Sequence, residues 1–486
     1  MDHSPRGPRA SLWPTFVLTS LLLAATLVGC AAAQGAGAST GDWTRFGFDA
    51  VRSGVSTAPT GITPGNVQSL AQHEQRVSLP GTVDASPIYL HGVAIGGATH
   101  DAFFVTTTYG KTLAIDAGNG RILWTFTPSG YGSYAGSYRI TTATPVADPS
   151  RSAIYAADPD GMIHKLSVAD GRVLWSTSVT RLPGREKIAS ALNLVGRHVI
   201  VTTGGYIGDA PPYQGHVAVL DASSGKLLRV WNSLCSDKAG LLDPGKDCAQ
   251  SDSAIWGRAG AVVDPSSQDI FVATGNAPWN GTTDWGDAVL ELSPDASTLL
   301  GNYTPTNTDY LNAADLDLGS TSPALLGDGY IAQGGKDGVI RVLDWSKLLG
   351  TAPHREDASQ TVPTPSGGKL FTALAVWHHG GQTWLFAADN GGTAAWTFAG
   401  GRLHPAWKTG SGGTSPVLAG GLLYVYDPGG SGLRVYEPTS GDVMATLPAG
   451  RGHWNSPIVI DGRIALPEGN ANSHRTSGVL DIWRLP

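Results

Sequence analysis

The chain has few charged residues and lacks the motifs of two common enzyme classes. Only 15% of its 486 residues are Asp, Glu, Lys or Arg, and the formal net charge is −7. That balance provides no basic face for nucleic acid, so no nucleic-acid partner is expected. The sequence also lacks the Gly-x-x-x-x-Gly-Lys-Ser/Thr loop of nucleotide-binding proteins and the His-Glu-x-x-His motif of zinc proteases. It is therefore not expected to belong to either class.

Cysteine is nearly absent, with only Cys30, Cys235 and Cys248. None of them lies in a Cys-x-x-Cys-His sequence, so no covalently attached haem is expected. Cys235 and Cys248 lie close together in a polar segment, and an oxidising compartment would join them in a local disulfide. Metal ligation by this pair is the weaker alternative, because no nearby His or further Cys would complete a site.

The first 30 residues have the pattern of an export signal. Arg6 and Arg9 precede the apolar run 17–28, which is too short to be a comfortable membrane span. Residues 27–30, Leu-Val-Gly-Cys, match the bacterial lipobox and predict that Cys30 is lipidated, whereas the alternative is cleavage within 31–38. Either route predicts a protein of the periplasm or cell envelope, attached to a membrane only through its signal or a lipid anchor.

Glycine is abundant, and one short sequence motif recurs along the chain. The chain has 65 Gly and 31 Pro without a collagen-like period, which suits many short strands joined by tight turns. Residues 112–124 read TLAIDAGNGRILW, and residues 161–175 read GMIHKLSVADGRVLW. Related segments occur at 216–231 and 433–447, with weaker copies at 288–300, 339–350 and 393–407. Each contains an apolar strand, a turn with Asp or Gly and a second strand, so each predicts a β-hairpin.

Ser-Pro or Thr-Pro dipeptides mark the starts of several apolar runs. Because Pro at the first residue of a strand removes no hydrogen bond from the sheet, these dipeptides predict strand starts. They lie at 86–87, 144–145, 322–323, 415–416 and 456–457. Weaker starts near 190, 260 and 372 complete eight units with the spacing of propeller blades. The sequence therefore predicts an all-β fold: one eight-bladed β-propeller domain of four-stranded blades at 42–486, after a flexible linker at 31–41.

The repeated phrase, which ends in Asp-x-x-x-Gly-x-x-x-Trp, resembles the tryptophan-docking motif of the quinoprotein dehydrogenase superfamily. The opening from Trp43 through Arg52 to Leu70 is similar to the N-terminal segment of its alcohol dehydrogenases, which depend on pyrroloquinoline quinone (PQQ). The resemblance extends from about residue 42 to the C-terminus. It implies eight W-shaped blades around a central site in which PQQ lies beside a metal ion, Ca²⁺ or a lanthanide.

Five residues match the family's cofactor site. Trp256, in Ile-Trp-Gly, resembles the tryptophan that forms the floor beneath PQQ, and Asn276, in Thr-Gly-Asn, resembles an amide ligand of the metal. Asp315 matches the catalytic base, which takes the hydroxyl proton while hydride leaves the substrate carbon. Asp317 matches an additional metal ligand, and Lys336 matches the cation that contacts the quinone oxygens. Without the resemblance, they would be a core aromatic, a turn residue, two solvated loop carboxylates and a hairpin lysine.

The sequence departs from the family at two places. Tyr206 stands where a metal-binding Glu is expected, which removes one carboxylate from the ligands that a hard cation prefers. Asp209, three residues later, is the nearest carboxylate that would replace it. The adjacent Cys-Cys pair that stacks on PQQ in many members is also absent, and Tyr134 or Tyr138 would serve as an aromatic lid instead.

Two functions from different classes follow from these features. The first is an exported PQQ-dependent oxidoreductase that acts on an alcohol, a sugar or a polymer hydroxyl and passes electrons to an external cytochrome or quinone. The second is a non-catalytic propeller lipoprotein that binds other envelope proteins, similar to the scaffold of bacterial outer-membrane protein assembly. The retained site residues favour the first function, and the lipobox and the missing Glu favour the second.

Overall fold

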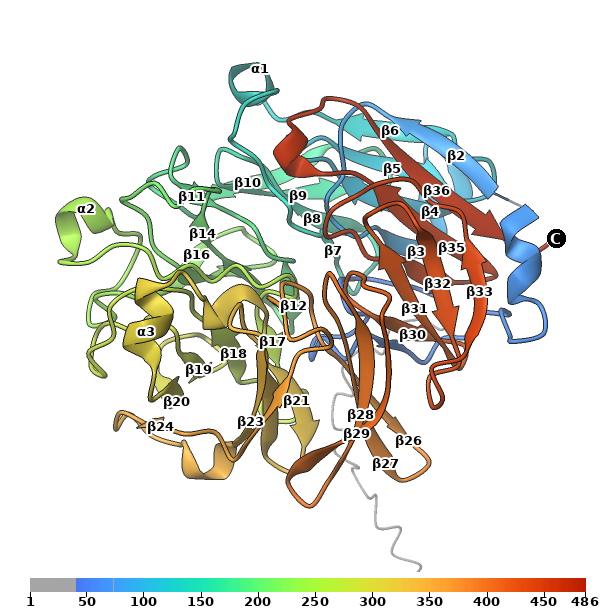
Figure 1. Cartoon of the computed structure of the whole chain (residues 1–486). Coiled ribbons are helices and arrows are strands. Elements are labelled where there is room, and N and C mark those ends of the chain that lie inside the picture. Colours follow the sequence, from blue (N-terminus) through green and yellow to red (C-terminus); the bar gives the residue numbers. More distant parts are fainter. Residues whose placement is uncertain (1–40, 73) are drawn as a thin grey trace, which may run out of the picture. The chain divides into compact units, whose positions relative to one another are not determined.

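The computed structural model describes residues 41–72 and 74–486, which form one compact unit. The signal, the lipidated Cys30 and the linker as far as residue 40 lie outside the described residues, so these expectations stay predictions. Eight sheets of four or five strands each follow one another around a common centre (Figure 1). The predicted eight-bladed β-propeller is confirmed.

The first four blades occupy the N-terminal half of the unit, and their strands pair antiparallel. Blade 1 contains β3 (Ile88–Ile95), β4 (Ala98–Thr106), β5 (Thr112–Asp116) and β6 (Ile122–Phe126), and blade 2 contains β7 (Val146–Ala147), β8 (Ala153–Ala157), β9 (Met162–Ser167) and β10 (Val173–Ser178). Blade 3 contains β12 (Asn193–Val195), β13 (His198–Thr202), β15 (His216–Asp221) and β16 (Leu227–Asn232), and blade 4 contains β17 (Val262–Val263), β18 (Ile270–Ala273), β19 (Val289–Leu292) and β20 (Leu299–Pro305). The first strand of each blade begins shortly after a predicted start.

The remaining blades follow the same order. Blade 5 contains β21 (Ala324–Gly327), β22 (Tyr330–Gln333), β23 (Val339–Asp344) and β25 (Gln360–Pro363), and blade 6 contains β26 (Ala375–His379), β27 (Gln382–Ala388), β28 (Thr393–Ala399) and β29 (Arg402–Thr409). Blade 7 contains β30 (Val417–Ala419), β31 (Leu422–Asp427), β32 (Gly432–Tyr436) and β33 (Val443–Leu447), and blade 8 contains β34 (Ile458–Ile460), β35 (Arg463–Glu468) and β36 (Gly478–Arg484).

Blade 8 is completed by a strand from the other end of the chain. β2 (Glu74–Leu79) pairs antiparallel with β36, with Arg76 opposite Asp481. The C-terminal segment supplies three strands, and an unpaired β36 would expose a row of free backbone groups, so β2 covers that edge and closes the ring. β1 (Val55–Ser56) extends blade 7 by pairing parallel with β30.

Short elements lie in the connections between strands. Strands β11 (Glu186–Lys187) and β14 (Gly204–Gly205) form a small ladder, and β24 (Arg355–Glu356) pairs with β20. The helices are α1 (Tyr131–Tyr134), α2 (Pro244–Asp247) and α3 (Thr308–Ala313), and the 3-10 turns are η1 (Val67–Gln72), η2 (Leu318–Ser320), η3 (Trp345–Lys347) and η4 (Ala471–Ser473). Within the described ranges, no helix has the length and apolar character needed to cross a bilayer.

Tryptophans of one blade dock on the hairpin turn of the next. The indole N–H of Trp124 in blade 1 donates to the carbonyl of Val168 in blade 2 at 2.8 Å. Its ring lies over Gly171, where an added Cβ would be 2.6 Å from the ring. Trp175 packs on Gly225 and Trp407 on Gly441 in the same way. The glycine of the repeat is therefore required both for a left-handed turn and for contact with a flat ring.

Candidate active site

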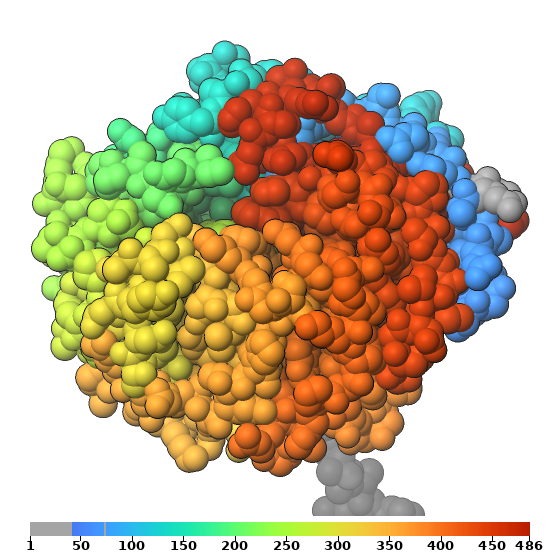
Figure 2. Space-filling model, viewed as in Figure 1, coloured from blue at the N-terminus to red at the C-terminus, as the bar shows by residue number. Residues whose placement is uncertain are grey.

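All five predicted site residues line one cavity of about 430 Å³: Trp256, Asn276, Asp315, Asp317 and Lys336. They come from separate segments, yet the blade topology brings them together. In an antiparallel meander, the start of the first strand and the turn between the second and third strands lie at the same end. Trp256, Asp315 and Asp317 precede first strands, whereas Asn276 and Lys336 follow second strands. Figure 2 shows this face of the unit, hollowed where yellow, green and red segments meet.

Lys336 joins the two carboxylates of the Asp-Leu-Asp segment. Its ammonium nitrogen lies 2.8 Å from Oδ1 of Asp315 and also forms an ion pair with Asp317. The side chain of Asp315 is 57% exposed, whereas that of Asp317 is 4% exposed. Burial lowers the pKa of Lys336, but the charges and hydrogen bonds of the two aspartates outweigh it, so the net shift raises this pKa. Lys336 is thus held in its charged form.

Asp317 also fixes the segment that carries Asn276. Its Oδ1 accepts a hydrogen bond of 2.6 Å from the backbone N–H of Asn276. This close approach requires Gly275, because an added Cβ there would lie 2.5 Å from the same oxygen. The side-chain amide of Asn276 has no hydrogen-bond partner among the described residues and lines the cavity. The Thr-Gly-Asn segment therefore places a free amide beside a buried carboxylate.

The Asp317 end of the cavity is strongly acidic. Asp209 reaches this end, and the hydroxyl of Tyr213 donates to its Oδ1 at 3.1 Å. Burial raises the pKa of Asp209, and so does the charge of Asp317. Behind them, burial raises the pKa of the fully buried Asp287 well above its usual value, and its Oδ2 has no hydrogen-bond partner among the described residues. A cation here would relieve this crowding of negative charge.

The oxygen atoms at this end of the cavity are of the types that bind hard cations. Carboxylate oxygens of Asp209 and Asp317 and the amide oxygen of Asn276 are the ligand types that Ca²⁺ and lanthanides take. The carboxylates of Asp315 and Asp317 do not point at one shared position, as the ligands of a metal ion would, because the Lys336 ammonium lies between them. Elsewhere in the described chain, His91, Asp101 and Asp461 do converge, but the Arg463 guanidinium already pairs with both carboxylates.

An aromatic surface forms the other wall of the cavity. The rings of Trp256, Phe371 and Trp454 lie 5.9 to 6.1 Å apart in all three pairs. The ammonium of Lys336 lies 5.4 Å from the centre of the Trp256 ring, close enough for a cation–π contact. A flat ligand that packs on Trp256 would therefore have Lys336 at its edge.

Tyr206 does not replace the missing Glu in the cavity. Its hydroxyl turns away and donates to the backbone carbonyl of Pro183 at 2.9 Å, and its ring packs with Tyr109, Tyr134 and Ile140. Tyr206 lines the cavity without a carboxylate, and Asp209, three residues later, brings one to it. Neither tyrosine considered as an aromatic lid lines the cavity: Tyr134 is buried in this cluster and Tyr138 packs edge-on against the Tyr206 ring, so the lid stays a prediction.

Sequence reasoning missed several residues of the cavity, among them Lys187, Tyr213, Lys369, Phe371, His453, Trp454 and Asn472. Their only shared signal is position, since each lies just ahead of a first strand or in the connection between second and third strands.

Cys235 and Cys248 are joined in a disulfide, as predicted, with their Cα atoms 5.7 Å apart.

Known proteins with similar sequences are of the kind that the sequence resembles. The PQQ_2 repeat family, described as "Outer membrane protein assembly factor BamB", matches residues 65–233. The quinohemoprotein alcohol dehydrogenase ADH IIB of Pseudomonas putida is 24% identical over 373 residues, which are 69% of this chain and 50% of that protein. A polyvinylalcohol dehydrogenase of a Pseudomonas species is 25% identical over 278 residues, which are 50% of this chain and 42% of that protein. The chain thus spans about half the length of these relatives.

The fold is also similar to that of a solved dehydrogenase. The quinohemoprotein alcohol dehydrogenase from Comamonas testosteroni superposes with a TM-score of 0.67 at 17% identity, covering 92% of this chain and 82% of that one. At this identity the likeness shows the fold alone. The predicted resemblance to PQQ-dependent alcohol dehydrogenase-like propellers is confirmed.

Proposed function

We propose that this protein is a PQQ-dependent oxidoreductase that converts a CH–OH group to a carbonyl. The observation that carries the proposal is the presence of Trp256, Asn276, Asp315, Asp317 and Lys336 around one cavity. The two named relatives, which act on alcohols and on polyvinylalcohol, support this reaction class. Alcohols, sugars and polymer hydroxyl groups are the substrate classes proposed.

The cavity's residues fit both the quinone and its metal. Trp256 would support the flat ring system, Lys336 would contact its oxygens, and Asn276, Asp317 and Asp209 would hold Ca²⁺ or a lanthanide. When bound, PQQ would supply a two-electron acceptor for the substrate hydride, with the metal polarising its reactive carbonyl and an external cytochrome or quinone receiving the electrons.

The two aspartates would have different roles in the reaction. Asp315 is the exposed carboxylate, so it would approach the substrate hydroxyl and take its proton as the carbonyl forms. Asp317 is buried, and its two oxygens hold the Asn276 segment and Lys336 in place. Lys336, paired with both, would keep Asp315 aimed into the cavity.

We propose export as the cellular context of this chemistry. The Cys235–Cys248 disulfide supports an oxidising compartment, in agreement with the signal and lipobox patterns. There the acceptor would be a separate cytochrome or quinone, and no haem is proposed in this chain.

The match of residues 65–233 to the BamB family model favours a second candidate function. In it, the propeller is an envelope scaffold that binds other proteins and holds no cofactor. The two candidates differ in one measurable property, the affinity for PQQ.

The test is a calorimetric titration of the purified protein with PQQ in the presence of Ca²⁺ or a lanthanide, together with dye-linked oxidation of an alcohol and sugar panel. We expect metal-dependent binding that Trp256→Leu abolishes. Trp384→Leu is the matched control, because that ring stacks on Phe386 in blade 6 and does not line the cavity. Absence of binding with every metal would contradict the dehydrogenase and favour the scaffold.

A further inference from the structure

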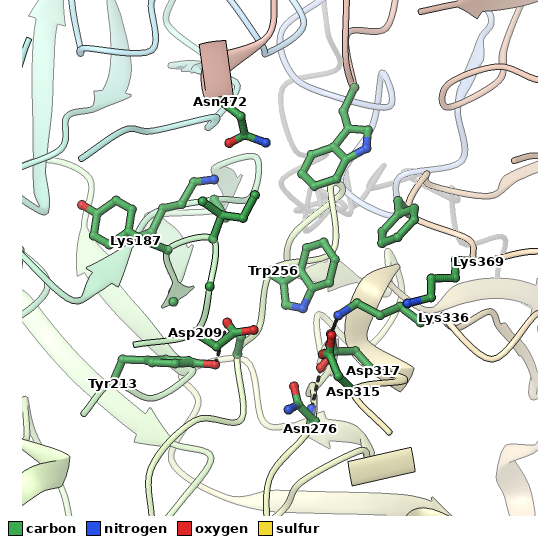
Figure 3. Close-up of a pocket in the computed structure, with 18 of the residues that line it drawn as sticks. Lys187, Asp209, Tyr213, Trp256, Asn276, Asp315, Asp317, Lys336, Lys369 and Asn472 are labelled. Carbon is green, nitrogen blue, oxygen red and sulfur yellow. Dashed lines mark hydrogen bonds and ion pairs between the residues drawn. The ribbon is translucent and has the colours of Figure 1, made fainter. Parts of the chain in front are cut away.

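Lys187 lines the cavity without a partner of its own. The residue is 8% exposed. It belongs to β11, which pairs with β14, so neighbouring side chains point to opposite sides. Glu186 turns into the protein, where Thr180 and Gln214 donate to its carboxylate, and Lys187 turns into the cavity (Figure 3). Across the described ranges, the Lys187 ammonium makes no hydrogen bond and no ion pair.

Asp84, the carboxylate whose charge acts on Lys187, is already satisfied by other groups. Its Oδ2 lies 2.7 Å from His453 Nδ1 and accepts from the backbone of Ala471 at 2.9 Å, and its Oδ1 accepts from the backbone of Trp454 at 3.1 Å. Burial lowers the pKa of Lys187 to about 8, and Asp84 only partly opposes this effect. A buried ammonium without a counter-ion is unfavourable, and Lys187 has none, so this end of the cavity suits an anionic group.

Polar groups of the cavity are segregated. In Figure 3, Lys187 and Asn472 approach one end, and Trp256 lies between them and the other end. At that other end gather Asp209, Asp315, Asp317 and Asn276, with Lys336 paired to two of the aspartates. The donors at the first end suit an anionic group, and the acceptors at the second suit a cation. A planar ligand on Trp256 would meet both.

We propose that Lys187 binds a carboxylate of the ligand in this cavity, with the Asn472 amide as a neutral donor beside it. The inference rests on the proposed function, since PQQ is a planar tricarboxylic acid. It gives the ligand a charged recognition element that the Trp256 and Lys336 contacts do not supply. Lys369 also lines the cavity, but it is exposed to solvent and would contribute less.

The test measures binding of PQQ and of its trimethyl ester by quenching of tryptophan fluorescence, with Ca²⁺ present. We expect Lys187→Met to weaken PQQ binding about 10- to 100-fold, the range for a hydrogen bond to a charged group. The ester should bind the wild type and the variant equally, because it cannot form the ion pair. Lys187→Gln is a second variant with a polar side chain, and Lys369→Met is the matched control, with an expected loss under about threefold.

Thermal unfolding of the ligand-free proteins provides the structural control. Removing an unpaired buried charge should leave the melting temperature unchanged or raise it, whereas a structural lysine would lower it on substitution. If wild type binds PQQ and both Lys187 variants bind it equally well, Lys187 is not a carboxylate-binding residue, although the proposed function stands. If wild type binds neither probe, the proposed function fails and this inference fails with it.

Discussion

Lys336 and Asp315 form an ion pair of 2.8 Å across the entrance of blade 5. Asp315 lies ahead of the 3-10 turn η2 that leads into the β21–β22 hairpin, and Lys336 follows the hairpin. The same ammonium pairs with Asp317, so one lysine positions an exposed and a buried carboxylate at once. The exposed one is the group that a substrate can reach.

Asp315→Asn should reduce turnover while leaving PQQ binding intact. An amide cannot accept the hydroxyl proton, and loss of a general base costs about 10²- to 10⁴-fold in rate. Asp315 has φ 51°, and because Asn tolerates this left-handed region, the substitution adds no backbone strain. Steady-state kinetics and a PQQ titration measure the two effects.

Asp328→Asn is the matched control for that variant. Asp328 is also exposed and has φ 52°, but it does not line the cavity. It should retain wild-type turnover. Unchanged turnover in Asp315→Asn would remove this residue from the mechanism.

Gly275→Ala should weaken metal binding. The added Cβ would lie 2.5 Å from Oδ1 of Asp317, so the carboxylate must leave the backbone N–H of Asn276. We expect roughly a tenfold or greater loss of affinity, about the effect of one displaced charged hydrogen bond. Luminescence of bound Tb³⁺ reports it without turnover. Gly410→Ala is the control, since an added Cβ there has nothing within 4 Å, and equal affinities in both variants would contradict the role given to Asp317.

The repeats were predictable because each depends on local sequence, whereas the five residues around the cavity were predicted through the family resemblance of the short segments that contain them. An Asp-Gly turn before a tryptophan is visible in the chain, and so are Thr-Gly-Asn and Asp-Leu-Asp. Lys187 was not predictable, because its importance comes from the absence of a partner in three dimensions. The closing strand β2 was also missed, since its partner β36 lies at the far end of the chain and no local pattern links them.

Gly171→Ala should destabilise the fold more than an ordinary turn glycine substitution. Gly171 has φ 72°, which costs an alanine about 1 to 2 kcal/mol, and its added Cβ would also lie 2.6 Å from the Trp124 ring. Displacing the ring would break the Trp124 hydrogen bond to Val168. We expect a total loss of about 3 kcal/mol, measured by urea unfolding.

Gly196→Ala separates strain from the steric clash. Gly196 has φ 57°, and an added Cβ there has nothing within 4 Å. The Gly196→Ala substitution should therefore lower the free energy of unfolding only by the backbone strain. If both variants lose the same stability, tryptophan docking contributes nothing beyond the turn.

Asp481→Asn should stabilise the closing blade at alkaline pH. Burial raises the pKa of Asp481, and the neighbouring Glu468 carboxylate raises it further. The folded protein therefore keeps a proton that the unfolded chain releases above about pH 4, so stability falls as pH rises from there toward the raised pKa. The amide removes this dependence, with an expected gain on the order of 1 kcal/mol at pH 8 and little change at pH 4. Midpoints of urea unfolding at these two pH values test the prediction. Parallel pH profiles of stability for wild type and variant would contradict it.

Affinity for PQQ should fall as pH rises through about 8. Burial lowers the pKa of Lys187 to about 8, so its ammonium is lost above that pH and with it the ion pair to a ligand carboxylate. The charged groups that face Lys187 are Asp84, whose pKa is lowered, and the Arg258 guanidinium, whose pKa burial lowers. Lys336 titrates at higher pH, because its aspartate partners raise its pKa.

In the wild type, the affinity for PQQ should decline nearly tenfold per pH unit above 8, since each unit removes nine-tenths of the remaining Lys187 ammonium. Lys187→Met should show weaker binding at pH 7 and an almost flat profile up to pH 9.5. Fluorescence titrations at half-unit intervals measure both curves. A decline of equal steepness in the variant would assign the titrating group to another residue, and a flat wild-type profile would show that Lys187 does not pair with the ligand.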